Sequence, residues 1–236
     1  MKLGYPYPMP SSRKKVRRGD QVIIHKLKWA EHFWNLKKLE SPKILNNPEN
    51  LTIILCHNYD YTPLVEESLK HFGLKYINLG YGSEKDGINV NVTGKIYPII
   101  KYIESGKCKT GLILYLDARD SVILKDLQEL VEFYKSLWWC DLFFCSTAAK
   151  RGIFRQRKDI YIQNKKTIRR FSRYLNAGGF IGRTNFIYQV FKKIEMLADV
   201  YKNEKFLYSD QDLLRYMYPI LFPRIEIDHW NQVFFR

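Results

Sequence analysis

Short apolar runs alternate along the chain with segments of helical periodicity, and this alternation constrains the fold more than any other feature. The runs are almost continuously apolar, as strands are when helices cover both faces of their sheet. They occupy residues 51–58, 74–80, 111–117 and 141–147. Between them, apolar side chains at 63–73 and 124–137 recur every three or four positions, as in amphipathic helices. The pattern predicts an α/β domain whose sheet is covered on both faces.

The length and composition are those of a folded domain. The chain has 236 residues, of which 46% are hydrophobic and 15% aromatic, so it can bury a sizeable core as one domain. We expect this domain to span residues 51–236. Residues 1–50 differ: they contain prolines, a basic cluster at 13–18 and a basic, aromatic-rich helical pattern at 26–39. They are predicted to form a basic extension that packs on the core.

Other segments of the domain are less regular. Residues 94–107 have a helical pattern that Pro98 should start late or kink. Residues 174–186 are rich in glycine and typical of turns. Three further elements are expected: an amphipathic helix at 186–201, a short helix at 209–219 with Ser209 as its N-cap, and a terminal strand at 224–235.

The net charge limits the classes of partner. Lys and Arg number 39 against 24 Asp and Glu, which gives a formal charge of +15. Such a balance favours nucleic acid, an anionic membrane or an acidic substrate. The charge is concentrated in residues 150–173, where ten basic residues accompany one acid.

The cysteines and the chain start suggest the compartment. Cys56, Cys108, Cys140 and Cys145 lack the spacing of a metal or redox motif, so we interpret them as thiols in a reducing compartment. The first twelve residues lack the apolar stretch of a signal peptide. The most apolar window, 136–149, is too short to span a bilayer. We expect a cytoplasmic protein without a transmembrane segment, in the host cytoplasm if the chain is viral.

Two aspartates end one of the apolar runs. In "LYLDARD", Asp117 is the last residue of the run at 111–117, and Asp120 lies three residues later. They could cap the next helix or hold a cation. Ligands in open α/β sheets bind at the carboxyl ends of the strands, so position favours a site. Carboxylates suit Mg²⁺ and Mn²⁺, and imidazole suits Mn²⁺. His229, near the end of the terminal strand, is a candidate third ligand.

Several motifs resemble those of one family. "LYLDARDSVIL", "YLNAGGFIG", "SDQDLL" and "IEIDHWNQVFF" occur in this order in the chain. The order is similar to that of GT-A glycosyltransferases, above all the glycosyltransferase domain of procollagen lysyl hydroxylases and related collagen and lipooligosaccharide sugar transferases. "INLGYGSEKDG" and "TGKIYPIIKYI" also resemble a region of that family. The resemblance covers roughly residues 50–236. It implies a Rossmann-like mixed sheet in a single domain of GT-A type.

The resemblance also implies roles for the matched residues. Asp117, Asp120 and His229 would bind Mn²⁺ (or Mg²⁺), which bridges the diphosphate of a UDP-sugar donor. Arg119 stands where the family often has an aromatic residue, and its guanidinium can stack on the base. Donor binding is assigned to Cys56, Asn58, Lys95, Arg119, Asn176, Gly178 and Gly179.

The same resemblance places an acidic motif on the reacting side. Asp210, Gln211 and Asp212 would line the place where sugar and acceptor meet, with Asp210 or Asp212 as base or charge stabiliser. The basic segment 150–173 lies between the metal motif and the glycine-rich motif, so it should overhang the acceptor. Acceptor binding is therefore assigned to Arg155, Arg157, Lys165, Lys166, Arg169, Arg170 and Arg173.

A polyanion is the acceptor that this charge favours. Phosphate contacts give binding that weakens steeply with salt. DNA offers a hydroxyl for glycosylation where a base carries one, as hydroxymethylcytosine does. We therefore expect a phage-type DNA glycosyltransferase, which would flip the base out of the duplex.

Alternatives remain open within and beyond this class. The acceptor could be an anionic lipooligosaccharide at a membrane surface or a hydroxylysine-like protein group. A nucleotidyltransferase also uses carboxylates and a nucleotide. A haloacid-dehalogenase-type phosphatase needs its second aspartate two residues after the first, whereas here it is three. A chain of another class, a non-catalytic nucleic-acid-binding protein on a decayed scaffold, would have no need of Asp117, Asp120, Asp210 and His229.

Overall fold

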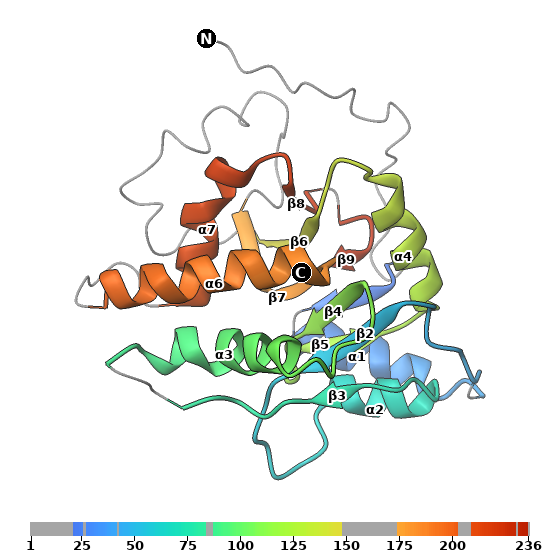
Figure 1. Cartoon of the computed structure of the whole chain (residues 1–236). Helices are drawn as coiled ribbons and strands as arrows, with labels where there is room; N and C mark the ends of the chain where they lie inside the picture. Colours follow the sequence, from blue (N-terminus) through green and yellow to red (C-terminus); the bar gives the residue numbers. More distant parts are fainter. Residues whose placement is uncertain are drawn as a thin grey trace.

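A computed structural model describes residues 21–25, 27–41, 43–83, 87–147, 174–202, 209–229 and 231–235. Its strands are β1 (Ile23–His25), β2 (Leu51–Leu55), β3 (Ile77–Asn78), β4 (Leu112–Leu116), β5 (Ser121–Ile123), β6 (Leu142–Thr147), β7 (Tyr174–Arg183), β8 (Ile225–Ile227) and β9 (Phe234–Phe235). Its helices are α1 (Leu27–Lys37), α2 (Leu64–His71), α3 (Val90–Glu104), α4 (Leu127–Ser136), α6 (Thr184–Val200) and α7 (Asp210–Leu221). Figure 1 labels them along the chain.

A six-stranded mixed sheet forms the centre, in the order β3-β2-β4-β7-β6-β8. Strands β3, β2 and β4 are parallel to one another, and so are β6 and β8. Strand β7 runs antiparallel to both of its neighbours and joins the two halves. The α/β class, the single domain and the mixed sheet that the resemblance implied are confirmed.

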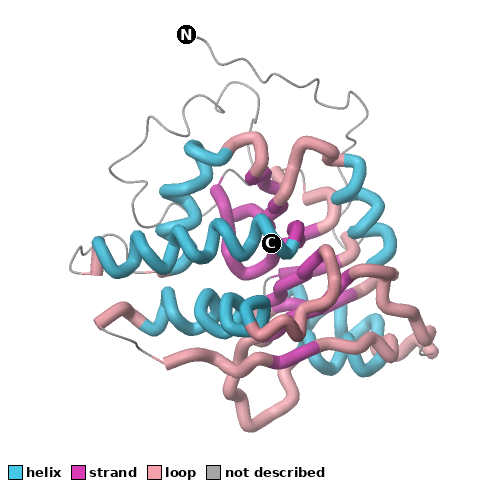
Figure 2. Tube along the Cα trace, viewed as in Figure 1, coloured by secondary structure: helices cyan, strands magenta, loops and turns pink. Residues whose placement is uncertain are grey.

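Helices cover both faces of this sheet (Figure 2). Alternate residues of β4 contribute to separate cores: Ile113 and Tyr115 to one, Leu112, Leu114 and Leu116 to the other. The first core includes residues of α3, α6 and α7, and the second includes residues of α2 and α4. A strand covered on both sides must be apolar at every position, which explains the continuous run in the sequence. None of the helices in the described ranges is long and apolar enough to cross a bilayer.

A second, three-stranded sheet lies beside the first and has the order β5-β1-β9. Strand β1 pairs antiparallel with β5 and parallel with β9. Its residues Ile23 and Ile24 are fully buried. Helix α1 follows β1, and its Trp34 donates a hydrogen bond to Glu67 of α2 at 2.8 Å. Strand β1 and helix α1 thus pack against the rest of the domain.

The glycine-rich segment is not a series of turns. Residues 174–183 form β7, a ten-residue strand that is buried at every position except its last. Opposite β6, the pairing jumps from Phe180 to Asn176, so residues 177–179 form a bulge. Glycine in a strand commonly marks a bulge or a close approach rather than a turn, and here it marks both.

Two other elements differ from the expectation. Helix α3 starts at Val90, earlier than Pro98 suggested. Pro98 lacks the N–H that would bond to the carbonyl of Gly94, but Gly82 N donates to that carbonyl at 2.9 Å. The terminal strand is divided into β8 and β9, which belong to different sheets. Between them the buried Asp228 carboxylate accepts hydrogen bonds from the backbone of residues 232–234, which explains the aspartate in the turn.

Candidate active site

Two cavities meet at the carboxyl end of β4. The first, of about 300 Å³, is lined by residues from β1, α3, β7 and the start of α7. The second, of about 550 Å³, is lined mainly by the loops that follow β2 and β4. They share four lining residues: Tyr81, Tyr115, Asp117 and Asp120. The two aspartates therefore lie between the two cavities.

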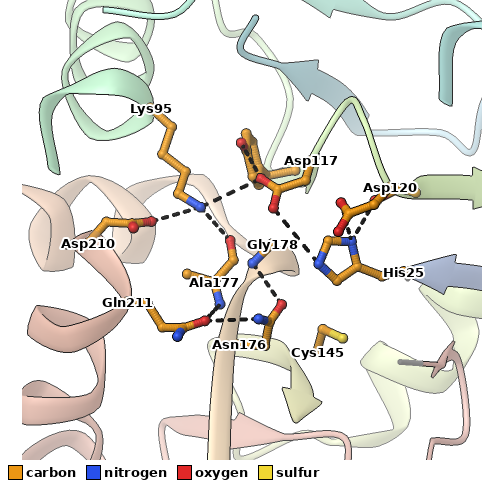
Figure 3. A network of polar contacts seen from close by, with 12 residues as sticks. His25, Lys95, Asp117, Asp120, Cys145, Asn176, Ala177, Gly178, Asp210 and Gln211 are labelled. Carbon is orange, nitrogen blue, oxygen red and sulfur yellow. Dashed lines mark hydrogen bonds and ion pairs between the residues drawn. The ribbon is translucent and has the colours of Figure 1, made fainter. Parts of the chain in front are cut away.

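The carboxylates of Asp117 and Asp120 lie beside an imidazole, that of His25 (Figure 3). His25 Nε2 is 3.8 Å from Asp117 Oδ2, and His25 Nδ1 is 3.4 Å from Asp120 Oδ1. One ligand atom from each residue lies within 4.8 Å of the others. Two carboxylates and an imidazole form a ligand set that suits a divalent cation such as Mn²⁺. No sequence pattern had indicated His25 as a ligand.

His229 does not join this cluster. It follows β8, which lies three strand positions from β4 in the sheet, or about 14 Å at a usual strand spacing of about 4.8 Å. Its Nε2 lies 4.0 Å from Glu226 Oε1 instead. The imidazole beside the two aspartates is therefore not the one that the sequence suggested, because the sequence does not reveal which strand end reaches β4.

A buried ion pair occupies the first cavity. Lys95 Nζ of α3 lies 2.7 Å from Asp210 Oδ2 and 3.8 Å from Asp117 Oδ1, and it donates to the carbonyl of Ala177 at 2.7 Å. Burial disfavours the ammonium, but the carboxylates of Asp210 and Asp117 outweigh it and raise the pKa of Lys95 above its usual value. Lys95 therefore remains a cation inside the cavity.

Hydrogen bonds connect the bulge of β7 to α7 on one side and to Asp117 on the other. Asn176 Nδ2 donates to Gln211 Oε1 at 2.8 Å, and Asn176 Oδ1 accepts from Gly178 N at 3.0 Å. Gly178 O in turn accepts from Asp117 N at 2.8 Å. Asn176, Gly178, Asp210 and Gln211 thus line one cavity. Ser209 accepts from Asp212 N, which confirms it as the N-cap of α7.

Gly178 permits the close approach of the ligand residues. A Cβ at this position would collide with the His25 imidazole and with the Asp117 carboxylate, both of which are fixed by other contacts. We expect Gly178→Ala to displace both groups and to cost about 1–3 kcal/mol of stability. The matched control is Gly179→Ala, because a Cβ there would meet only ordinary contacts at 3.4 Å or more. Thermal melts check the prediction; equal melting temperatures of the two variants would contradict it.

The second cavity contains three of the residues that the resemblance assigned to donor binding. Cys56, Asn58 and Arg119 line it together with His57 and Tyr59. Burial raises the pKa of the Cys56 thiol to about 12, so this thiol is not a nucleophile at neutral pH. Asn58 uses its amide structurally, since it bonds both the N–H and the carbonyl of Tyr81.

An aromatic stack borders the same cavity. The rings of His57 and Tyr59 are stacked with their centroids 5.2 Å apart, and those of Tyr59 and Tyr61 are stacked with their centroids 5.0 Å apart. His57 is anchored by Glu66, with Nε2 3.0 Å from Oε1. Tyr59 is exposed and lines the same cavity as Arg119, so its ring offers a flat surface there.

Two assigned residues face away from the cavities. A side chain at Gly179 would point toward Phe234 and Cys145, because successive strand residues face opposite sides of a sheet. Asp212 Oδ2 accepts from Ser209 Oγ at 2.9 Å and completes the cap of α7. Neither residue lines either cavity. The residues assigned to acceptor binding lie within 150–173, outside the described part of the chain.

Six residues that line the first cavity were not assigned to the site from the sequence: His25, Tyr81, Asn91, Tyr115, Ala177 and Ser209. Tyr115 donates to Asp117 Oδ1 at 2.9 Å. Its position two residues before Asp117 was a usable signal, because residues i and i+2 of a strand share a face. Tyr81 and Asn91 carried no comparable signal.

Comparison with known proteins gives the family. The model of the PLOD GT domain matches residues 50–213, more than half of the chain. No curated protein sequence is significantly similar. Among solved structures, mouse xyloside xylosyltransferase 1 in its apo form is 14% identical with a TM-score of 0.45, over 86% of this chain and 82% of that one. An active-site mutant of LgtC is 17% identical with a TM-score of 0.41, over 75% and 72%. The chain belongs to the PLOD GT domain family, the glycosyltransferase domains of lysyl hydroxylases.

Proposed function

We propose that this glycosyltransferase moves a sugar from a UDP-sugar to a hydroxyl group of a polyanionic acceptor, with Mn²⁺ or Mg²⁺ bound by Asp117 and Asp120. The observation that carries the proposal is the pair of cavities that meet at these two aspartates. A nucleoside fits the larger one, with the Tyr59 ring and Arg119 available to its base. The sugar then lies in the smaller one, and the diphosphate that joins them passes the aspartates.

The ligand atoms support a cation at this junction. Carboxylates within 4.8 Å of each other repel unless a cation lies between them. When bound, the cation supplies Lewis-acid chemistry, because it stabilises negative charge on the departing diphosphate. Tyr115 keeps Asp117 oriented through its hydroxyl hydrogen bond.

The residues of the smaller cavity assist the reaction itself. The acceptor oxygen forms a bond to the anomeric carbon, the bond from that carbon to the diphosphate oxygen breaks, and UDP leaves with the electron pair. Lys95 adds positive charge on the diphosphate side. Asp210, held by Lys95, is our choice over Asp212 for stabilising the charge on the sugar or accepting the acceptor proton, because only Asp210 lines the cavity. The hydrogen bond between Asn176 and Gln211 fixes the part of the cavity wall that would face the sugar.

The acceptor proposal rests on charge. The net +15 and the ten basic residues of segment 150–173 favour an acceptor rich in phosphate. A hydroxymethylated DNA base satisfies both the charge and the need for a hydroxyl. Lipooligosaccharide and protein acceptors are tested as alternatives below.

The deciding experiment measures UDP release from a panel of UDP-sugars with Mn²⁺. Each donor is assayed alone, with DNA that contains hydroxymethylcytosine, and with unmodified DNA of the same sequence. We expect one sugar to give release that only the modified DNA stimulates. In the charge-reversal variant of Arg169 and Arg170, this stimulation should fall while release without DNA stays unchanged.

Two other results would exclude the DNA acceptor or the UDP-sugar donor. Release that ignores DNA would preserve the UDP-sugar transferase and exclude the DNA acceptor, so lipooligosaccharide and hydroxylysine peptides would be assayed next. An absence of release with any UDP-sugar, in a protein that is folded, would overturn the donor proposal and favour a nucleotidyltransferase or a nucleic-acid-binding protein.

A further inference from the structure

Strand β1 carries a histidine into the aspartate pair from outside the family region. His25 is the last residue of β1 and lies opposite Ser121, the first residue of β5. The family model begins to match at residue 50, so β1 lies wholly before it. His25 is only 1% exposed, although the carboxylates that it faces are partly open to solvent. A buried imidazole held in one place at an open carboxylate pair is an arrangement that a bound cation would explain.

The spacing of the three groups fits one ion. The imidazole nitrogens lie 3.8 Å from Asp117 Oδ2 and 3.4 Å from Asp120 Oδ1. Ligand atoms at about 2.1 Å from an octahedral ion lie about 3 Å from one another. With one ligand atom from each residue, the three atoms lie within 4.8 Å of one another, so each side chain needs to move by up to about 1 Å toward a common centre.

A hydroxyl group fixes the imidazole for this purpose. Ser121 Oγ is 2.8 Å from His25 Nδ1, and both residues are buried. If Nδ1 carries the proton and donates it to Ser121, Nε2 keeps its lone pair on the side of Asp117. Metal-binding histidines usually have their second nitrogen held in this way, which sets the tautomer and the ring orientation.

The opposite wall leaves room for the imidazole. Gly178 of β7 is the residue whose Cβ would collide with both His25 Nε2 and Asp117 Oδ2. Three separate elements, β1, the end of β4 and the β7 bulge, thus bring these atoms together (Figure 3). The contact does not depend on any one flexible side chain.

We propose that His25 is a ligand of the divalent cation, so that the N-terminal strand completes a metal site whose two aspartates lie in the family region. The inference rests on the proposed function, which assigns only Asp117 and Asp120 to the cation. It also gives β1 a task beyond packing, because a bound ion would link the three-stranded sheet to the end of β4.

The first test measures binding of Mn²⁺ alone, by the loss of the free-ion EPR signal. Wild type, His25→Gln, His229→Gln and Asp117→Asn are compared, with circular dichroism as a check of the fold. We expect His25→Gln to raise the Kd for Mn²⁺ at least about 10-fold, and His229→Gln to leave it unchanged. A wild-type Kd in folded His25→Gln would overturn the inference. An absence of binding in wild type, or wild-type binding in Asp117→Asn, would instead overturn the metal site of the proposed function.

A second test uses the unaltered chain, in case His25→Gln does not fold. Mn²⁺ broadens the NMR signals of nearby nuclei, and the chain has only five histidines. After backbone-based assignment, substoichiometric Mn²⁺ should broaden the imidazole of His25 first, while those of His32 and His71 stay sharp. Mg²⁺ serves as the diamagnetic control. Broadening of His229 with His25 unaffected would overturn the inference and restore the ligand that the sequence suggested.

Discussion

Replacing Asp117 by asparagine is expected to lower kcat/KM for sugar transfer by about 10³-fold or more. A Lewis-acid cation lowers the barrier of such a step by several kcal/mol. Each factor of ten in rate corresponds to about 1.4 kcal/mol of barrier. Asp117 directly follows the fully buried strand β4 and, like Asp120, lines both cavities and lies beside His25. Loss of its charge removes the strongest ligand from the junction.

The fold should tolerate this change. Asparagine has the same shape, and its amide oxygen can still accept the Tyr115 hydroxyl hydrogen bond. Lys95 keeps its closer partner, Asp210, at 2.7 Å. Removing one of two neighbouring carboxylates also relieves repulsion when no cation is bound. The melting temperature without metal should therefore stay the same or rise.

Metal-dependent stabilisation separates the ligand role from a general effect of charge. A ligand at a hundredfold excess over its Kd stabilises the folded state by about 2.7 kcal/mol, which corresponds to roughly 5–10 °C for a domain of this size. Mn²⁺ should raise the melting temperature of wild type by this order and leave Asp117→Asn unchanged.

The matched control is Asp126→Asn. Asp126 caps α4 through a hydrogen bond from Gln128 N, and asparagine caps a helix equally well. This variant loses the same charge outside the site and should keep both activity and the Mn²⁺ shift. Near-normal transfer in Asp117→Asn and Asp120→Asn would contradict the metal assignment.

The sequence was sufficient for the elements that depend on local patterns. The continuous run at residues 111–117 is β4, because helices pack on both of its faces. The two aspartates after it lie at a carboxyl strand end, where an α/β sheet places its ligands. Ser209 caps α7 as the pattern indicated. In each case a few consecutive residues contain the whole signal.

The parts that the sequence missed depend on pairing between distant segments. Strand β1 has only three residues, too few for a periodicity, and its place is set by pairing with β5 and β9. His25 and His229 both follow short apolar runs, yet only the sheet order determines which one reaches β4. The glycines of β7 resemble a turn in sequence because their reason lies elsewhere, in the atoms of His25 and Asp117 that approach them.

The second large effect is expected for the buried pair of Lys95 and Asp210. Breaking a buried ion pair by removing one partner typically costs about 3–5 kcal/mol, because the other charge stays buried without compensation. Lys95→Met leaves the Asp210 carboxylate, 7% exposed, without its ammonium partner. At roughly 2–4 °C per kcal/mol, the melting temperature should fall by about 10 °C, and transfer should be lost.

The two single variants should differ in cost. Asp210→Asn leaves Lys95 with a second carboxylate, Asp117 at 3.8 Å, and with the carbonyl of Ala177 at 2.7 Å. Asp210→Asn should therefore destabilise the protein less than Lys95→Met does. Lys101→Met is the matched control, because Lys101 lies on the exposed side of the same helix, and it should change neither stability nor transfer.

The double variant separates the structural role of the pair from its function. Lys95→Met combined with Asp210→Leu replaces both charges with apolar side chains, a change that is often neutral or stabilising at buried pairs. We expect it to recover most of the melting temperature that Lys95→Met loses but none of the transfer, since in the proposed function Lys95 supplies positive charge to the diphosphate and Asp210 supplies the carboxylate beside the sugar. Recovered activity in the double variant would show that the pair only maintains the fold. Loss of activity in a stable double variant would show that at least one of the two charges takes part in the reaction.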